Sequence, residues 1–318
     1  MKIILLSLGA CLLAVETSFT FSPGVQFVLF IAGILFLGIP HGAADLLVAT
    51  KNSTDTQSFS PAKFHLKYLV QLGTFALLFW LFPVAANFVF MILAAYHFGE
   101  TDLVGFDNTS IAGKCMIIIY GILILAVILL PHFETLKPIF ALFESGRNNG
   151  NLIQFVDTHR YELLSLIGVM FLTSLGCYGR IYSFNYKLLA VFLAEYLTLL
   201  VILFFLPMIL GFTFYFVLWH SLFSLRNIIR YLRNGCAISL HSIVKQIAVY
   251  SLISFAGFLI FGCTGLLFLS NDSIIAYVFL ALAVLTAPHM QVMHKMYKRI
   301  KTQRFSGQHV HLSKPLLS

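Results

Sequence analysis

The chain has 318 residues, of which 59% are hydrophobic and only 10% charged, and its mean hydropathy is +0.92. Soluble globular domains carry roughly a quarter charged residues, so this composition excludes an ordinary soluble domain. The formal charge of +8 does not indicate a nucleic-acid binder, because the basic residues lie in short clusters between long apolar runs. We therefore predict an all-α, polytopic membrane protein whose basic residues mark its orientation in the bilayer.

Apolar runs long enough to cross a bilayer as helices need roughly 17 to 25 residues, and the sequence offers about ten. Proline begins helices and breaks their interiors, so Pro83 and Pro207 each divide a long run into two predicted helices. Merging one of these pairs would leave nine. The first run is predicted to be a retained helix and not a cleaved signal, because only Lys2 is basic and the stretch before Cys11 is short. The predicted spans lie approximately at 3–19, 25–48, 66–82, 84–99, 113–130, 161–178, 186–206, 208–225, 246–269 and 273–293.

The distribution of Lys and Arg predicts the orientation of these spans. With both termini on the cytoplasmic side, 17 of the 20 basic residues fall inside, as the positive-inside rule requires. The three exceptions are Lys137, Arg147 and Arg160, all in the longest outer loop, where charge bias counts least. No repeat or linker suggests a second domain. We therefore predict one membrane domain over 1–297 and a basic cytoplasmic tail over 298–318.

Four of the eleven histidines lie within predicted spans, and the others, including His294 in the basic tail, are expected to be solvated. The four helices all run from outside to inside in the predicted topology, and each histidine lies in the inner half of its helix, so the side chains can converge. Neutral imidazoles suit iron, zinc or copper, and a set without thiolates favours a redox metal with open positions. The alternative is four separate histidines that hydrogen-bond helices together or lie among lipid headgroups. The four are His41, His97, His220 and His289.

Carboxylates inside predicted spans are costly in lipid and therefore indicate a site within the bundle. Asp45 lies four residues after His41, so on a helix it shares a face with that histidine and can accept an imidazole N–H from it or from another ligand. Two further carboxylates follow His97 by three and five positions. For Glu195, near the centre of a predicted span, support of a ligand and a plain interhelical hydrogen bond are both open. The candidate supporting residues are Asp45, Glu100, Asp102 and Glu195.

Each of the four histidines lies in a short motif. Residues 38–45 read G-x-P-H-G-A-x-D and residues 96–102 read Y-H-F-G-x-x-D, while 219–221 read Trp-His-Ser and 288–290 read Pro-His-Met. Together these motifs resemble the Brp/Blh family of bacterial and archaeal integral-membrane carotenoid oxygenases, which cleave β-carotene at its central double bond to give two retinals. The resemblance covers most of the chain, from about residue 25 to 297.

The resemblance implies a non-haem Fe(II) held by the four histidines, O2 as co-substrate, and carboxylates that orient the imidazoles. It also implies β-carotene or a related carotenoid taken from the lipid bilayer, a bacterial or archaeal inner-membrane location, and a retinal-binding rhodopsin as a candidate acceptor of the product. Many members carry a second histidine four residues after the one in the Trp-His-Ser motif. Here that position is Ser224, so we expect His289 to complete the ligand set. The pocket candidates are Tyr96, Phe98, Trp219 and Met290.

Two other classes of membrane protein use the same residue types. A proton- or solute-coupled transporter would place His, Asp and Glu within its spans, but such proteins often show internal repeats, and the sequence shows none. A histidine-ligated membrane haem protein usually needs two histidines on one helix, whereas each span here offers one. Both remain alternatives to the oxygenase function.

Overall fold

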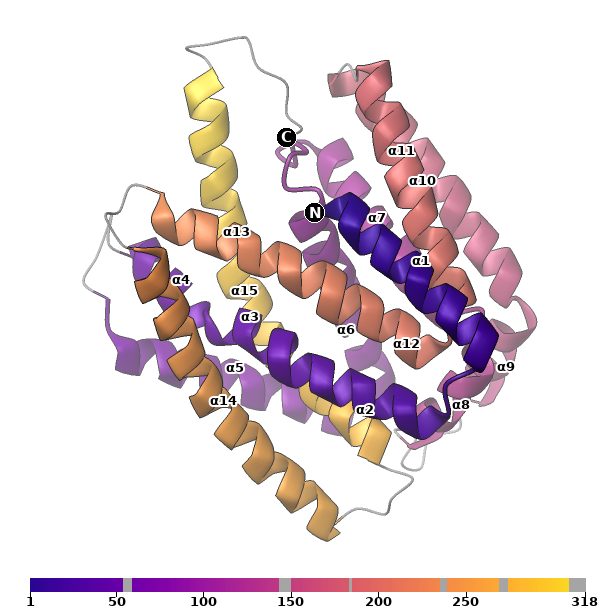
Figure 1. Cartoon of the computed structure of the whole chain (residues 1–318), viewed down its shortest axis with the longest axis horizontal. Coiled ribbons are helices and arrows are strands. Elements are labelled where there is room, and N and C mark those ends of the chain that lie inside the picture. Colours follow the sequence, from indigo (N-terminus) through magenta and orange to yellow (C-terminus); the bar gives the residue numbers. More distant parts are fainter. Residues whose placement is uncertain (54–58, 143–149, 183–184, 235–238, 269–273, 309–318) are drawn as a thin grey trace.

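The computed structural model describes residues 1–53, 59–142, 150–182, 185–234, 239–268 and 274–308, and these residues form helices with no strands (Figure 1). In chain order, the helices are α1 (Lys2–Phe19), α2 (Pro23–Gly33), η1 (Ile34–Gly38), α3 (Ile39–Ala43), α4 (Asp45–Ser53), α5 (Pro61–Leu81), α6 (Pro83–Asp102), α7 (Ile111–Leu129), α8 (Phe133–Leu142), α9 (Gly150–Thr158), α10 (Arg160–Tyr182), α11 (Tyr186–Phe205), α12 (Met208–Phe212), η2 (Thr213–His220), α13 (Ser221–Arg233), α14 (Leu240–Phe268) and α15 (Ile274–Gln308).

Eight helical segments within the described residues are long and apolar enough to cross a membrane. The predicted class, an all-α protein with many membrane helices, is therefore confirmed. The total of nine to ten spans and the cytoplasmic side of both termini stay predictions. The eight segments are Lys2–Phe19, Pro23–Ser53, Pro61–Leu81, Pro83–Asp102, Ile111–Leu129, Arg160–Tyr182, Tyr186–Phe205 and Met208–Arg233.

Proline separates consecutive helices where the sequence predicts it. Helix α5 ends at Leu81 and α6 begins at Pro83, while α11 ends at Phe205 and α12 begins directly after Pro207. Proline fits the first turn of a helix, where its missing N–H has no partner to lose, and does not continue a preceding helix. The two prolines thus set the start of α6 and the end of α11. The division of each long apolar run into two helices, predicted from the sequence, is confirmed.

Helices α6 and α7 pack backbone against backbone at the centre of the bundle. A Cβ atom added to Gly121 would lie 1.9 Å from the carbonyl oxygen of Ala95, and one added to Gly99 would lie 2.1 Å from that of Ile117. Only glycine permits such an approach, which is a usual way for membrane helices to associate without a hydrophobic driving force. This contact holds the segment of α6 that carries His97 deep in the protein.

Two helical stretches beside the candidate histidines are widened to π-helix, η1 just before His41 and η2 ending at His220. In η1 the N–H of Ile39 reaches the carbonyl of Ile34, five residues back, and Pro40 follows with no N–H to donate. Widened turns of this kind occur frequently at functional sites because they re-aim the side chains that follow. The sequence gives no sign of η2, which contains no proline.

Helix η2 lies at the middle of the molecule, between α12 and α13 in Figure 1. Its Phe214 and Tyr215 are fully buried. Two glycines let neighbouring helices approach it: a Cβ on Gly9 of α1 would lie 2.5 Å from Phe214, and one on Gly33 of α2 would lie 2.9 Å from Val217. The element that carries His220 is therefore enclosed by α1 and α2 as well as by α6.

Candidate metal centre

The four histidines of the predicted spans lie together in the interior of the bundle. They come from four elements that are far apart in the sequence, and α3, α6 and α15 pass through the middle of Figure 1. Each is almost inaccessible to solvent, with exposures of 5% for His41, 2% for His97, 0% for His220 and 4% for His289. The five other histidines within the described residues are partly or fully exposed, unlike these four.

The four imidazole rings form a closed cycle of neighbours. Ring centres lie 5.6 Å apart for His41 and His220, 4.8 Å for His220 and His97, 5.2 Å for His97 and His289, and 5.0 Å for His289 and His41. With metal–nitrogen bonds of about 2.1 Å, two ligand rings at angles between 90° and tetrahedral would have centres roughly 4.5–5.2 Å apart. Three of the observed spacings lie within this range, and the fourth, between His41 and His220, lies slightly above it.

Six ring nitrogens of the cluster are buried without a hydrogen-bond partner among the described residues. They are Nδ1 of His41, both nitrogens of His97 and of His220, and Nε2 of His289. A buried polar atom left unpaired costs about 1–3 kcal/mol, and a single ion bound by one nitrogen of each ring would account for four of the six. Neutral imidazole nitrogens are common ligands of transition metals, and the donor set therefore fits a metal ion.

The cluster is not yet a closed ligand set. Among the described residues, no group of three or more His, Cys, Asp or Glu side chains is tight enough to hold a metal ion as it stands. The 5.6 Å spacing of His41 and His220 agrees with this, because a small inward movement or a rotation of the imidazoles is needed for all four to converge on one ion. The assignment of these four histidines as ligands stays a prediction.

Asp45 contacts the cluster through His289 and not through His41. Its Oδ1 lies 2.8 Å from Nδ1 of His289, and its Oδ2 accepts a hydrogen bond of 3.1 Å from the hydroxyl of Tyr68. The carboxylate is 4% exposed. A carboxylate accepts only an N–H, so Nδ1 of His289 carries the proton and Nε2 keeps its lone pair for a ligand. Tyr68 was not predicted, and its only sequence signal is a hydroxyl within an apolar run.

Asp102 makes no hydrogen bond to any cluster histidine. Its Oδ2 accepts three hydrogen bonds of 3.0 Å, from the hydroxyls of Tyr120 and Tyr215 and from the indole N–H of Trp219. Its Oδ1 is buried with no partner in the described part of the chain. Because Trp219 directly precedes His220, this carboxylate holds the end of η2 against α6 and α7. Asp102 was expected to orient an imidazole, but in the structure it positions helix η2 instead.

Glu100 and Glu195 also contact groups outside the cluster. Glu100 is 1% exposed and accepts hydrogen bonds of 3.1 Å from the hydroxyl of Tyr96 and from Nδ1 of His294. His294 is about half exposed, in keeping with the expectation of a solvated residue, but it also pairs with a buried carboxylate, which was not predicted. Glu195 forms an ion pair of 2.8 Å with Lys2, which joins α11 to α1, so of the two open possibilities the interhelical contact is the one observed.

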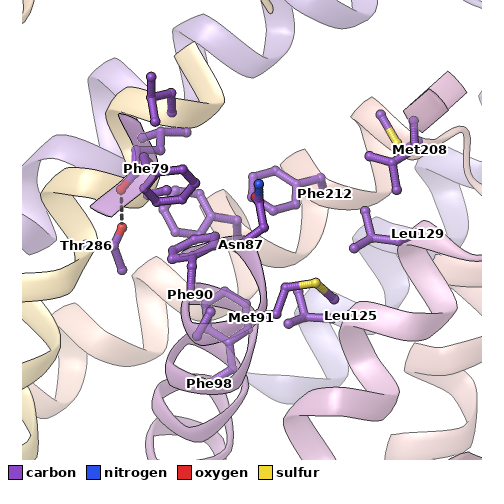
Figure 2. Close-up of a pocket in the computed structure, with 16 residues that line it drawn as sticks. Phe79, Asn87, Phe90, Met91, Phe98, Leu125, Leu129, Met208, Phe212 and Thr286 are labelled. Carbon is purple, nitrogen blue, oxygen red and sulfur yellow. Dashed lines mark hydrogen bonds between the residues drawn. The ribbon is translucent and has the colours of Figure 1, made fainter. Parts of the chain in front are cut away.

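An apolar cavity of about 120 Å³ adjoins the cluster, and most of its wall is labelled in Figure 2. Phe98 and Phe216 line it and also touch the imidazoles: ring centres lie 4.8 Å apart for Phe98 and His220, and 6.0 Å for Phe216 and His41. A second apolar cavity of about 370 Å³ shares wall residues with the first. Apolar cavities thus follow α6 from beside the histidines toward the start of that helix.

Of the four predicted pocket residues, only Phe98 lines either cavity. Tyr96 faces Glu100, Trp219 is bound to Asp102, and Met290 is buried beside His289. Phe216 was not predicted, because one phenylalanine among 33 carries no sequence signal. Ser224 is fully buried one turn after His220, and His289, in contact with both His41 and His97, closes the cluster without a histidine at that position.

The fold and the cluster define a polytopic helical membrane protein with a candidate metal centre at the end of an apolar cavity. A sequence model of the beta-carotene 15,15'-dioxygenase family matches residues 32–297, and the chain belongs to this family. This is the family that the four motifs predict, and the match includes all four histidines.

Two curated relatives carry the same name. The chain is 28% identical over 216 residues to the protein named probable beta-carotene 15,15'-dioxygenase Blh of Halobacterium salinarum, an overlap of 64% of this chain and 62% of that protein. It is 25% identical over 270 residues to the beta-carotene 15,15'-dioxygenase of an uncultured marine bacterium, 66A03, covering 82% of this chain and 90% of that protein. The chain thus spans less than two thirds of the archaeal relative's length. No solved structure matches the chain.

Proposed function

We propose that this protein cleaves β-carotene or a related carotenoid at its central double bond, with O2 as co-substrate, to give two molecules of retinal. The family and the names of two relatives support this activity. The observation that carries it is the meeting of four buried histidines from four helices at the inner end of an apolar cavity. A hydrocarbon has no group for a protein acid, base or nucleophile to act on, so the oxidation needs a bound redox centre.

The proposed cofactor is a non-haem Fe(II) held by His41, His97, His220 and His289. When bound, this ion supplies the activation of O2, which neutral imidazoles and apolar side chains do not provide. Neutral imidazoles suit it, and each of the four rings has at least one buried nitrogen without a partner within the described residues. Asp45 keeps the proton of His289 on Nδ1, 2.8 Å from its own Oδ1, and so keeps Nε2 available.

The apolar side chains of the cavity position the substrate and exclude water. Phe98 and Phe216 line the cavity and also contact the histidine rings, so a polyene lying along them brings a double bond beside the cluster while its surface remains covered. Burial of apolar surface contributes about 25 cal/mol per Å², which binds a long hydrocarbon without any polar contact. A dry site also protects a reactive intermediate from hydrolysis and proton exchange.

The membrane location completes the proposal. A carotenoid is dissolved in the bilayer, and eight helices of the described residues are long and apolar enough to lie there. We place the protein in the inner membrane of a bacterial or archaeal cell, where the substrate enters from lipid and retinal returns to it. A retinal-binding rhodopsin in the same membrane is a suitable acceptor.

The deciding experiment expresses the protein in bacteria that accumulate β-carotene and measures retinal, residual carotenoid and the iron content of the purified protein. The wild type is expected to form retinal and to hold about one iron per chain. His97→Ala should lower both to background, because removal of one ligand leaves an incomplete set. His241→Ala is the matched control, since His241 is exposed and far from the cluster in sequence, and it should behave as the wild type.

Unchanged iron content in both His97→Ala and His220→Ala would reject the metal centre. A wild type that holds its iron but forms no retinal from β-carotene would indicate a different oxygenase reaction. An intense Soret absorption band would favour the haem alternative, and carotenoid-independent proton uptake into vesicles would favour the transporter.

A further inference from the structure

The two apolar cavities adjoin each other along α6, and a single polar residue is common to both walls. The first follows α6 from Phe98 back to Asn87, and the second follows the same helix from Ile92 to Pro83. The residues that line both are Asn87, Met91, Leu125, Leu129 and Leu136. Figure 2 shows Asn87 among aromatic and aliphatic side chains, with Phe98 at the other end of the row along α6.

The side-chain amide of Asn87 has polar atoms that make no hydrogen bond within the described residues. Its amide group donates one hydrogen bond of 2.9 Å, to the carbonyl of Pro83, which leaves a second N–H and the side-chain carbonyl oxygen without a partner among the described residues. Thr286, the other polar residue of the first cavity, is different, because its hydroxyl already donates to the carbonyl of Leu282 at 2.5 Å. An asparagine offers both a donor and an acceptor, and this one lines two cavities whose other walls are almost entirely apolar.

The distance from the histidines to Asn87 along α6 matches half the length of a carotenoid. Asn87 precedes His97 by ten residues on the same uninterrupted helix, which is about 15 Å along the axis at the α-helical rise. An all-trans polyene extends over about the same distance from its central double bond to the far side of its end ring. With the central bond at the histidines, an end ring therefore lies beside Asn87.

We propose that Asn87 is a specificity-determining residue that recognises a hydroxyl group on the end ring of the carotenoid. This inference rests on the proposed function and names the substrate class more closely: a carotenoid with an oxygen substituent on the ring that occupies the second cavity. The ring hydroxyl donates to the side-chain carbonyl of Asn87 and accepts from its remaining N–H.

The physical reason is that a purely hydrocarbon ring leaves this amide unpaired. Leaving a polar group buried and unpaired is costly, and a site built to hydrogen-bond a hydroxyl rejects the analogue that lacks one far more strongly than an apolar pocket rejects a small change in size. Asn87 is only partly buried, so the penalty is smaller than for a fully buried group, and we expect a preference of about tenfold and not the far larger ratios of fully buried polar sites.

The test compares kcat/KM for β-carotene and for its monohydroxylated derivative in the full-length protein, reconstituted in lipid. The wild type is expected to prefer the monohydroxylated carotenoid about tenfold, and Asn87→Leu to remove or reverse that preference by losing activity on the hydroxylated substrate alone. Asn151→Leu is the matched control, because Asn151 is exposed on α9; it should keep the wild-type ratio. Iron content and thermal stability of each variant report whether it has folded.

The outcomes separate the two proposals. A wild type that cleaves neither carotenoid contradicts the proposed function itself. A wild type that cleaves both, with a substrate ratio that Asn87→Leu leaves unchanged while iron and stability are intact, overturns the role of Asn87 alone. A preference that shifts only in the Asn87 variant supports it.

Discussion

Asp45 and Asp102 are two carboxylates at similar sequence distances from a cluster histidine, yet they do different work. Asp45 follows His41 by four residues and accepts an N–H from a different histidine, His289. Asp102 follows His97 by five residues and accepts from two tyrosine hydroxyls and an indole. Asp45 thus contacts an imidazole directly, whereas Asp102 contacts tyrosine and tryptophan side chains and no cluster imidazole.

The difference shows that spacing along a helix fixes the face of a residue but not its partner. Asp45 faces α15 and α5, which bring His289 and Tyr68 to it, whereas Asp102 faces α7 and η2. The first arrangement controls the proton and the ring orientation of one imidazole. The second controls where a whole helix, and therefore His220, lies relative to α6.

Replacement of Asp45 is expected to have the largest effect of the two. Asp45→Ala leaves Nδ1 of His289 without its acceptor, so the ring is free to rotate and to change tautomer, and we expect a roughly 10- to 100-fold loss of iron affinity or activity. The measurement is iron titration of the purified variant alongside retinal formation. Asp45→Glu keeps a carboxylate and should recover part of the loss.

Tyr68→Phe separates the two contacts of Asp45, because it removes only the hydroxyl that donates to Oδ2. A loss smaller than that of Asp45→Ala is expected. Normal iron affinity in Asp45→Ala would show that the carboxylate does not support a ligand, and the comparison with Asp102 would then fail.

Replacement of Asp102 is expected to act on stability before it acts on iron. Asp102→Leu leaves the hydroxyls of Tyr120 and Tyr215 and the indole N–H of Trp219 without their acceptor, and the free energy of unfolding should fall by about 2–4 kcal/mol. Asp102→Asn keeps one carbonyl oxygen and should restore most of this. Thermal unfolding in detergent measures the change, and iron bound per folded chain should fall less than in Asp45→Ala.

A Leu variant at position 102 that unfolds normally but binds no iron would show that Asp102 acts on a ligand directly. Tyr215→Phe is a milder companion, since it deletes one of the three hydrogen bonds and leaves the ring in place. Its effect should be a fraction of that of Asp102→Leu.

Much of the fold was predictable from the sequence because it follows from local rules. Apolar runs predict membrane helices. Pro83 and Pro207 lie where one helix ends and the next begins, because proline fits a helix start and breaks a helix interior. The four histidines were also identifiable, because a polar side chain in lipid is rare enough to stand out. Their convergence could be predicted from their shared depth in the membrane, without knowledge of individual side-chain contacts.

The remaining features depend on which helices meet, and no local pattern encodes that. Glu195 pairs with Lys2, 193 residues away, and Asn87 becomes notable only once two cavities are seen to share it. The pairing of His294 with Glu100 was missed because basic residues follow His294, although the helix continues to Gln308 and brings that histidine to α6. The π-helix before His220 has no sequence signal that we can identify.

The smallest expected effect concerns a third carboxylate, Glu100, whose histidine partner lies outside the cluster. The hydrogen bond from His294 to Glu100 raises the pKa of that imidazole above its ordinary 6.5, against the opposing charges of Lys298 and Lys301. A raised folded-state pKa means that the stabilisation is complete below about 6.5 and is lost as pH rises through the raised value. The difference in Tm between wild type and His294→Gln should therefore be larger at about pH 6 than at about pH 9. It should be small, because His294 is half exposed, with iron content unchanged; an equal difference at both pH values would contradict the protonated pair.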